Sequence, residues 1–588
     1  MPVVEPVARL VSSLSPRSRA LVRITLRALE RSSVPRRFSR LSLERRTAFI
    51  ERMERSRVPL RRALILLPKT LASLAYARDA HVQDDVGSNP RCESDAEAPA
   101  RRLDPAAMRP AEPLESCDVV VVGSGAGGAA AARVLAEAGL DVVVVEEGGY
   151  HDAGSYSRDP LEALPMLYRD GGLTVCAGRP AIPLPVGRCV GGTTVINSGT
   201  CLHAPGDVLA RWRDEFGVGW ATELDAEFES LDRDLRVAPV DPARAGRNAE
   251  LCRIGAEAIG ARNGPLPRNA AGVSCCGTCP TGCAIDAKQA ANVSELPRAV
   301  AAGARIRADC RVERVLLDRG RAAGVACDGY EVRARAVVLA AGALGTPELL
   351  LRQGLASSSG EVGRRLRIHP ACWVGASFDE EVRGWDGVMQ SWHVGEWSDR
   401  GLFLEATFTP LAFGAHWLRG AGAAYKERIE RYSRMAIIGV HLSERSEGRL
   451  RPGRAGLRIG YRLSRRDAAT LRFGIARAAD IHFAAGAREV YPQVGRLAAI
   501  GPGGQSRVED GRFSPADLRL EAFHPMGTAR MGADPRRSVV GPSGEAHDVP
   551  GLHVADASLF PTSLRVNPML TIMACARRIA AGLAERLV

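Results

Sequence analysis

The chain has 588 residues, of which 46% are hydrophobic and 25% are charged, and its formal net charge is +12. A chain of this length exceeds one hydrophobic core, so we expect two or more domains. It contains no run of about 20 apolar residues free of charges and glycine clusters, and its first residues lack the apolar core of a signal peptide. We therefore predict neither a membrane-spanning helix nor an export signal, and we expect a cytoplasmic protein whose 14 cysteines are mostly reduced.

The excess positive charge belongs to residues 1–80. This segment holds 17 Arg and one Lys against six acidic residues, whereas the remainder holds 61 basic and 61 acidic residues. Three helices are predicted here, one after Ser15, one after Ser42 and one beginning at Pro59 with a wide apolar face. We interpret the segment as a basic helical arm, followed by a polar linker at residues 81–116. The arm either packs on the body or lies on an anionic membrane surface, at the inner face of the membrane. No basic groove continues beyond it, so no nucleic-acid partner is expected.

Residues 118–148 have the pattern of a βαβ unit that binds a dinucleotide. A Val-rich strand leads into the glycine motif Gly123-Ser-Gly125-Ala-Gly-Gly128, an Ala-rich helix follows, and a second Val-rich strand ends at Glu146. Gly123 permits the tight turn, Gly125 lets the backbone approach a pyrophosphate, and Gly128 lets the helix pack on the strand. The helix N-terminus offers free N–H groups to the phosphates, and Glu146 would accept a hydrogen bond from a ribose hydroxyl.

The middle of the chain alternates between helix and strand patterns. A glycine-rich turn within residues 187–199 offers backbone donors, hydroxyls and an amide. Helices are predicted within 205–235, strands within 304–317, and a second strand–turn–helix element within 334–354. Residues 371–514 carry mixed signals, many aromatic residues and no nucleotide motif, which favours an antiparallel sheet with helices that faces the substrate.

Four cysteines stand close together at Cys275, Cys276, Cys279 and Cys283. Neighbouring residues such as Cys275 and Cys276 do not easily face one cluster, so a four-ligand site would need another spaced cysteine. We favour buried thiols or a local disulfide, so no metal is assigned here. An iron–sulfur site and a zinc site remain alternatives.

The last 75 residues carry two polar side chains in distinctive settings. His524 precedes a Gly-Thr turn, and Asn567 with Pro568 opens the last long helix, where Asn is predicted as the N-cap and Pro as the first helical residue. Considered one at a time, Asn567 would be only a cap and His524 only a hydrogen-bonded loop histidine.

Together, these segments resemble one family. DVVVVGSGAGG, VVVVEEGG, GRCVGGTTVINSG, VVLAAGALGTPELL, HPMGTARMG and VADASLFPTSLRVNPMLT resemble the glucose–methanol–choline (GMC) flavoprotein oxidoreductases, and among them the long-chain fatty alcohol oxidases and dehydrogenases. The resemblance covers the chain from Asp118 to the C-terminus, and the arm resembles that of bacterial fatty-alcohol-oxidase-like members.

The resemblance implies an α/β fold class: a Rossmann-like FAD-binding domain with a mostly parallel sheet, an α+β substrate domain with an antiparallel sheet, and the helical arm. The expected FAD-binding parts are 117–204, 285–370 and 515–588, interrupted by a helical and cysteine-containing segment at 205–284 and by the substrate domain at 371–514.

The resemblance also assigns residues to the cofactor FAD. The expected FAD-contacting residues are Gly123, Gly125, Gly128, Glu146, Gly191, Gly192, Thr193, Asn197, Val312, Asp556, Ala557, Pro568 and Met569. It aligns His524 with the catalytic base and Asn567 with the second active-site residue. Glu405 is a weaker candidate for the substrate site, since a solvated or ion-paired Glu is the simpler interpretation.

The implied reaction is oxidation of a hydrophobic, long-chain primary alcohol to the aldehyde. A neutral imidazole suits removal of the hydroxyl proton as a hydride leaves for flavin N5, and the amide of Asn567 can donate to the developing alkoxide. Oxygen or a quinone would reoxidise the flavin. The alternatives are a sterol oxidase, a dehydrogenase with a quinone or protein acceptor, a light-driven fatty-acid decarboxylase and, outside enzymes, a silent membrane-docked flavoprotein.

Overall fold

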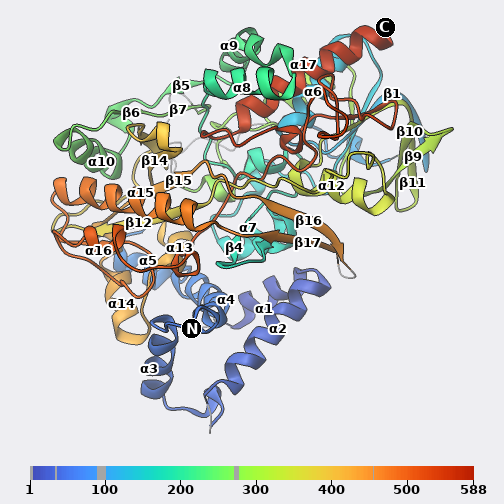
Figure 1. The fold of residues 1–588 in the computed structure, drawn as a ribbon. Helices are drawn as coiled ribbons and strands as arrows, with labels where there is room; N and C mark the ends of the chain where they lie inside the picture. Colours follow the sequence, from blue (N-terminus) through green and yellow to red (C-terminus); the bar gives the residue numbers. More distant parts are fainter. Residues whose placement is uncertain (1–3, 34–35, 89–100, 111, 271–276, 454–455) are drawn as a thin grey trace.

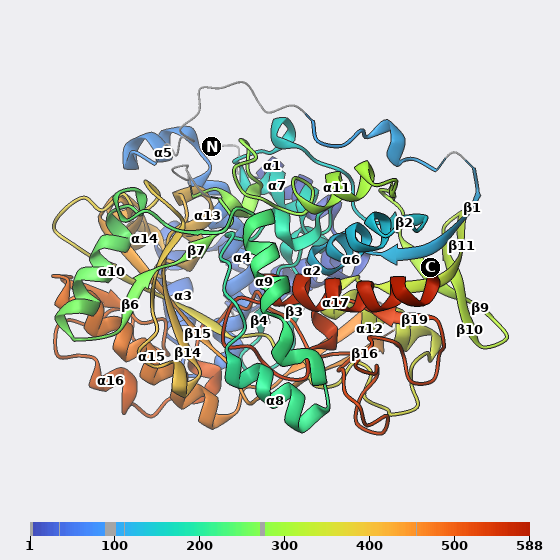
Figure 2. The ribbon, with the colours of Figure 1, turned by 90° about the horizontal axis from the view of Figure 1, so that it is seen from above.

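The computed structural model describes residues 4–33, 36–88, 101–110, 112–270, 277–453 and 456–588. It is a mixed α/β structure with two large sheets, and Figure 2 shows the two sheets side by side when the molecule is viewed from above. Figure 1 shows helices of the N-terminal arm, in blue, along the lower edge of the molecule. The sequence therefore predicted the fold class correctly.

The first sheet has seven strands in the order β8-β2-β1-β11-β10-β9, with β19 also paired to β11. Strands β8, β2, β1, β11 and β19 pair in parallel, and only β10 and β9 pair antiparallel. Their bounds are β1 Leu114–Val122, β2 Val142–Val145, β8 Arg305–Arg307, β9 Val312–Asp318, β10 Arg321–Cys327, β11 Tyr330–Leu339 and β19 Leu552–Val554. β1 therefore begins inside the predicted linker.

The Val runs form the centre of this sheet, where both of its faces are covered. Val119–Val121 and Val142–Val144 are fully buried, as expected for strands of a parallel sheet. Helix α6 (Ala126–Glu137) packs on β1 and β2 and against the last helix, α17 (Met569–Leu587). A Cβ on Gly128 would lie 1.9 Å from the carbonyl oxygen of Gly123, so only glycine permits this close packing of α6 on the turn.

The second sheet is antiparallel, with six strands in the order β18-β12-β15-β14-β13-β6. Its strands are β6 Asn263–Pro265, β12 Ala371–Ser377, β13 Gln390–Val394, β14 Leu402–Thr407, β15 Met435–Leu442 and β18 Glu489–Tyr491. Helices α10 (Arg247–Ala258) and α15 (Arg465–Ala484) pack on it. β6 and α10 come from the predicted segment 205–284, so that segment contributes to both halves of the molecule.

Shorter elements connect and cover the two sheets. The helices are α7 Pro160–Leu167, α8 Gly206–Phe216, α9 Asp225–Asp234, α11 Glu295–Ala301, α12 Gly342–Gln353, α13 Leu411–Gly414, α14 Gly422–Glu430 and α16 Ser506–Glu509. The short strands are β3 Val175–Cys176, β4 Ile182–Pro183, β5 Ala238–Pro239, β7 Pro267–Arg268, β16 Gly448–Gly453 and β17 Gly456–Tyr461. As predicted, α8 and α9 lie within 205–235, and α12 follows β11.

The arm comprises α1 (Val4–Ser13), α2 (Pro16–Arg31), α3 (Leu43–Glu54), α4 (Pro59–Ala77) and α5 (Ala80–Val86). The three predicted helices are α2, α3 and α4. The side chains of Ser15 and Ser42 accept hydrogen bonds from backbone N–H groups in the first turns of α2 and α3. The sequence reading missed α1 and α5, because each is short and α1 carries Pro6 in its first turn, where proline is tolerated.

The arm is attached to both halves of the protein. Arg62 on α4 pairs with Asp517 at 2.9 Å, and the backbone N–H of Gly420 donates to Glu54 at 2.7 Å. On the other half, the backbone N–H of Ser15 donates to Asp170 at 2.7 Å. No helix in the described ranges is long and apolar enough to cross a membrane.

Candidate active site

A cavity of about 1230 Å³ lies between the first sheet, the second sheet and the arm. Most of the residues that the sequence assigned to FAD or catalysis line it, and they come from all three predicted parts of the FAD-binding domain. They are Gly123, Gly125, Glu146, Gly192, Thr193, Asn197, Val312, His524, Asp556, Ala557, Asn567, Pro568 and Met569. Gly128, Gly191 and Glu405 are not part of its wall.

The N-terminus of α6 faces this cavity without a side-chain cap. Gly125 is the N-cap residue, and Ala126 and Gly127 line the wall, so the first N–H groups of the helix can bind an anion. A Cβ on Gly125 would have no atom nearer than 4.0 Å, whereas one on Gly127 would lie 1.8 Å from the carbonyl oxygen of Ala555. The absence of a side chain at Gly127 thus allows α6 to pack against the backbone at Ala555. At Gly125 it leaves space on the side where a pyrophosphate would lie.

Glu146, the expected ribose ligand, also fixes the glycine-rich turn. Its carboxylate accepts hydrogen bonds from the Ser124 N–H at 3.0 Å, the Ser124 hydroxyl at 2.7 Å and the Gly148 N–H at 2.9 Å. Burial raises the pKa of the Glu146 carboxyl, and these donors oppose that effect. A carboxylate has about four acceptor positions, so one remains for a ligand in the cavity. Gly191 reaches the same turn through its N–H, which donates to the Ser124 hydroxyl at 3.0 Å.

Asp556 joins the start of α12 to its own loop at the cavity wall. It accepts from the N–H of Gly342 at 2.8 Å and from the N–H of Ser558 at 2.7 Å, and the Thr346 hydroxyl also donates to it. Burial raises the pKa of Asp556, and these donors lower it. Asp556 therefore holds the N-terminus of α12 next to the loop that follows β19.

The start of the last helix differs from the prediction by one residue. α17 begins at Met569, and Pro568 rather than Asn567 occupies the N-cap position. Asn567 lies one residue earlier, is 8% exposed and lines the cavity. Proline cannot cap with its side chain, so the first N–H groups of α17 are not occupied by it. The prediction that Asn567 caps α17 is therefore wrong, and its predicted role as a hydrogen-bond donor stays a prediction.

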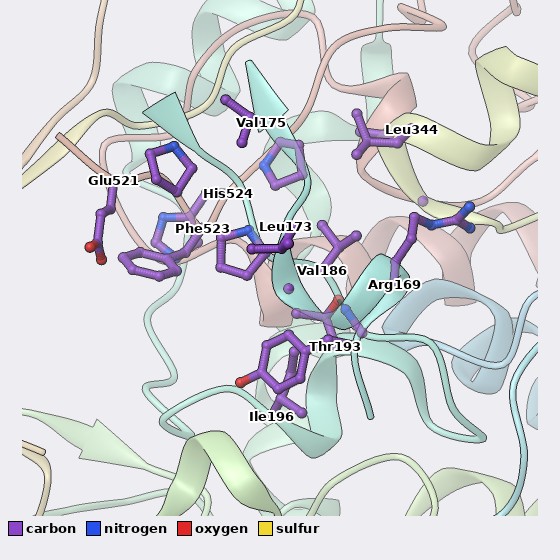
Figure 3. A pocket seen from close by; sticks show the side chains of 18 of the residues that line it. Arg169, Leu173, Val175, Val186, Thr193, Ile196, Leu344, Glu521, Phe523 and His524 are labelled. Carbon is purple, nitrogen blue, oxygen red and sulfur yellow. Dashed lines mark hydrogen bonds between the residues drawn. The ribbon is translucent and has the colours of Figure 1, made fainter. Parts of the chain in front are cut away.

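His524 lies on a loop that is paired with the chain segment preceding β12. Backbone bridges join Arg367 to Met526 and Ala371 to Glu521, and they bring His369 against His524. The Nδ1 atoms of the two rings are 3.1 Å apart. Burial, followed by the neighbouring imidazoles of His369 and His441, holds the pKa of His524 well below 6.5. His524 is therefore a neutral imidazole at the cavity wall, shown beside Phe523 in Figure 3.

The sequence reading missed two histidines of this site. His369 is buried behind His524, and its pKa is lowered to about 3, chiefly by burial. His441, on β15, lines the cavity, and its Nε2 lies 3.0 Å from Glu405 Oε2. Glu405 has no exposed surface, so it is not solvated, and its side chain contacts that of His441. The repeated His-Pro pair at residues 369–370 and 524–525 was an available signal.

Apolar side chains form much of the rest of the cavity wall, and the wall extends into the arm. Figure 3 shows Leu173, Val175, Val186 and Leu344 around the cavity, with His524 on one side and Arg169 on the other. From the arm, the cavity is lined by Leu10, Ala20, Leu21, Ile24, Leu60, Ala63, Leu66, Leu67, Leu71 and Leu74, together with Arg17, Thr25 and Thr70. A single cavity thus connects the residues predicted to bind FAD to α1, α2 and α4.

The cysteine segment is described only in part. Cys275 and Cys276 lie outside the described residues. The guanidinium of Arg268 donates to Cys279 Sγ at 3.5 Å, and the N–H of Lys288 donates to Cys283 Sγ at 3.5 Å. Within the described part of the chain, no three His, Cys, Asp or Glu side chains are grouped as a metal site.

Comparisons with known proteins identify the family. Two models described as GMC oxidoreductase match residues 164–371 and 440–576, and a model described as FAD binding domain matches residues 118–156. An uncharacterised GMC-type oxidoreductase of Mycobacterium tuberculosis is 39% identical over 98% of this chain and 93% of its own length. A long-chain-alcohol oxidase of Arabidopsis thaliana is 31% identical over 78% of this chain and 67% of its own.

Two solved structures share the fold. Pyridoxine 4-oxidase from Mesorbium loti has a TM-score of 0.61 and 20% identity, and covers 79% of this chain and 99% of its own. A variant of formate oxidase from Aspergillus oryzae has a TM-score of 0.61 and 16% identity, and covers 81% of this chain and 100% of its own. Because the two GMC models together match more than half of the residues, and relatives above 30% identity span most of the chain, this protein belongs to the FAD-binding GMC oxidoreductase family.

Proposed function

We propose that this enzyme oxidises a long-chain primary alcohol to the corresponding aldehyde. One observation carries the proposal: the cavity that contains His524 and Asn567 continues along an apolar wall into the arm. An alkyl chain bound there gains about 0.8 kcal/mol for each CH₂ group removed from water. The long-chain-alcohol oxidase of Arabidopsis thaliana, 31% identical, supports the same substrate class.

The polar residues of the cavity have separate roles in the proposed reaction. FAD supplies the hydride acceptor. His524, held neutral by burial, accepts the hydroxyl proton, since a neutral imidazole has a free lone pair. Asn567 cannot accept a proton, and its amide N–H donates a hydrogen bond to the oxygen as negative charge develops there. Glu146, Asp556 and the uncapped N-terminus of α6 hold the nucleotide part.

The proposal is tested by anaerobic reduction of the flavin with unbranched primary alcohols from C4 to C18 and with a sterol. We expect kcat/KM to rise about fourfold per CH₂ group over the lengths that the cavity can bury. Reoxidation by oxygen is compared with reoxidation by a quinone, which identifies the electron acceptor. Preference for the sterol, or equal rates for all chain lengths, would contradict the proposed substrate.

Two alanines on α2 provide a matched pair of variants. Ala20 and Ala28 are both exposed, but only Ala20 lines the cavity. Ala20→Trp should narrow the cavity and lower kcat/KM for C14 to C18 alcohols, with little change for C4 to C6. Ala28→Trp adds the same bulk elsewhere and should leave the chain-length profile unchanged. If both variants behave alike, the arm does not contact the alkyl chain.

We further propose that the arm brings the enzyme to an anionic membrane surface, where long-chain alcohols dissolve. Seven of the exposed large hydrophobic residues lie within the first 60 residues: Val4, Leu21, Ile24, Leu26, Leu43, Val58 and Leu60. Among them, Leu21, Ile24 and Leu60 also line the cavity, so its mouth is apolar, and Arg17 of the arm lines the cavity as well. Apolar side chains among basic residues are typical of surfaces that bind anionic membranes.

A further inference from the structure

Two ionisable side chains beside His524 have no role in the reaction as described so far. His441 lines the cavity, and its ring lies against that of His524 with centroids 5.9 Å apart and an interplanar angle of 22°. On the far side of His441, the fully buried Glu405 places its Oε2 3.0 Å from His441 Nε2. A carboxylate, an imidazole and the proposed base therefore follow one another toward the cavity.

The register of the second sheet makes this contact possible. In the antiparallel pair β14–β15, Glu405 is directly opposite Gly439, two residues before His441. A Cβ on Gly439 would lie 3.4 Å from His441 Nε2 and 3.3 Å from a methyl carbon of Thr407. Because Gly439 has no side chain, the space above it remains open for the contact between Glu405 and His441.

The burial of Glu405 limits the groups that can neutralise its charge. Neither of its oxygens has a hydrogen-bond partner within the described residues, because the 3.0 Å contact with His441 does not have hydrogen-bond angles. A buried carboxylate without donors remains ionised only beside a cation. The other imidazole opposite Glu405 is His393 on β13, and burial lowers the pKa of His393, so it stays neutral. His441 is therefore the imidazole in contact with Glu405 that can supply this cation.

The other two histidines of the cluster, His369 and His524, are neutral because they are buried. Burial is the main cause that lowers the pKa of both His369 and His524, and the neighbouring imidazoles lower it further. Within the described residues, the titratable groups found beside His441 are thus Glu405, His524 and His369. When the surroundings of two neighbouring titratable groups move their pKa values apart, one group can act as the base and the other can carry the proton.

We propose that His441, kept cationic by Glu405, is a further catalytic residue that donates a hydrogen bond to the oxygen of the alcohol. This inference rests on the proposed function. As the O–H bond breaks, the proton passes to His524 and the C=O bond forms, and bound FAD would supply the acceptor for the hydride that leaves carbon. His441 keeps its own proton and offsets the negative charge that develops on oxygen during this step.

The test compares two ligands of equal length, decanoate and decanamide, that bind to the oxidised holoenzyme without turnover. Their affinities are measured at neutral pH from the perturbation of flavin absorbance in the parent, Glu405→Gln and His441→Gln. We expect both variants to weaken decanoate about tenfold or more, since a hydrogen bond between charged groups is lost, and to change decanamide little. His482→Gln, a buried histidine of the same half that does not line the cavity, should change neither affinity.

Equal weakening of both ligands in Glu405→Gln would show that Glu405 is only structural, and unchanged binding of decanoate would show that His441 is not cationic. Either result overturns the inference. In the reaction, Glu405→Gln should lower the limiting rate of flavin reduction more than it raises KM. If no alcohol reduces the flavin, the proposed function fails, but the binding comparison still decides the charge of His441.

Discussion

His369 and His524 face each other through their Nδ1 atoms, 3.1 Å apart, and only one of the two atoms can carry the hydrogen between them. If His524 carries it, its Nε2 keeps the lone pair that a base needs, and His369 acts only as an acceptor. The low pKa of His369, about 3, keeps that acceptor available. The first two predictions follow from this relationship.

The rate of flavin reduction should not decline near pH 6.5 on the acid side. Burial lowers the pKa of His524, so its neutral form persists below the pH at which a free histidine is half protonated. Anaerobic stopped-flow measurements with a saturating alcohol, between pH 5 and pH 8, check this. An acid limb with its midpoint at the ordinary histidine value would show that His524 is not held neutral.

His524→Gln should lower the limiting rate of flavin reduction by about 10²–10⁴, the usual contribution of a general base. The amide of glutamine is similar in size but cannot accept the proton. The FAD content, read from the absorbance ratio at 280 and 450 nm, should equal that of the parent protein. A variant that reduces its flavin at the parent rate would remove His524 from the role of base.

Gly125→Ala should weaken FAD binding by about tenfold or more without destabilising the apoprotein. The added methyl group meets no protein atom within 4 Å other than Gly192 Cα at 4.0 Å, but it occupies the approach that a pyrophosphate needs. Titration of apoprotein with FAD, followed by flavin fluorescence, gives the affinity. Gly206→Ala is the control, because its added methyl group has no neighbour within 4 Å and lies outside the cavity.

The stability of the protein should fall between pH 6.5 and pH 4, in part because of His482. This buried histidine on α15 has its Nε2 3.0 Å from the carbonyl oxygen of Val374, and burial lowers its pKa to about 4. Between those pH values the unfolded chain binds a proton at this site and the folded protein does not, so acid favours unfolding by roughly 3 kcal/mol.

The thermal midpoint of His482→Gln should therefore fall less between pH 7.5 and pH 5 than that of the parent. Glutamine keeps a donor for Val374 and does not titrate. The parent and variant curves are compared in the same buffers, and parallel curves would contradict the assignment. Some acid dependence will remain, because burial also lowers the pKa of His553 to about 4.

Replacing apolar side chains at the cavity mouth should reduce membrane binding. Ile24 and Leu60 are 62% and 78% exposed, and the double variant Ile24→Ser, Leu60→Ser should sediment with phosphatidylglycerol vesicles about tenfold less than the parent. Leu317→Ser, on β9 and 45% exposed, is the control. Equal sedimentation of all three proteins would show that the arm does not bind the membrane through this mouth.

Much of the nucleotide-binding half could be predicted because its signals are local. The Val runs, the glycines at 123, 125 and 128 and the acid at the end of β2 lie within about 30 residues, and each has a steric or electrostatic reason. For the second sheet, the sequence predicted that the strands are antiparallel, but it predicted neither their order nor their register. Its register depends on pairing between strands that are distant in the sequence, and periodicity does not show which strands pair.

The histidine cluster shows what sequence reasoning could not find. His369 and His524 are 155 residues apart and meet only because two backbone bridges join their loops. His441 stands in a strand that otherwise reads as ordinary core, and nothing near it in the sequence points to Glu405. The predicted N-cap position of α17 differs from the observed one by a single residue, which is the usual uncertainty in the position of a helix end.

The attachment of the arm also has a consequence for biosynthesis. Arg62 pairs with Asp517, a partner that the ribosome adds 455 residues later. At about 5–20 residues per second, this interval lasts roughly half a minute or more. During that time, the later parts of the chain that cover the apolar sides of α2 and α4 have not been synthesised. A chaperone or a lipid surface would therefore bind these apolar sides first.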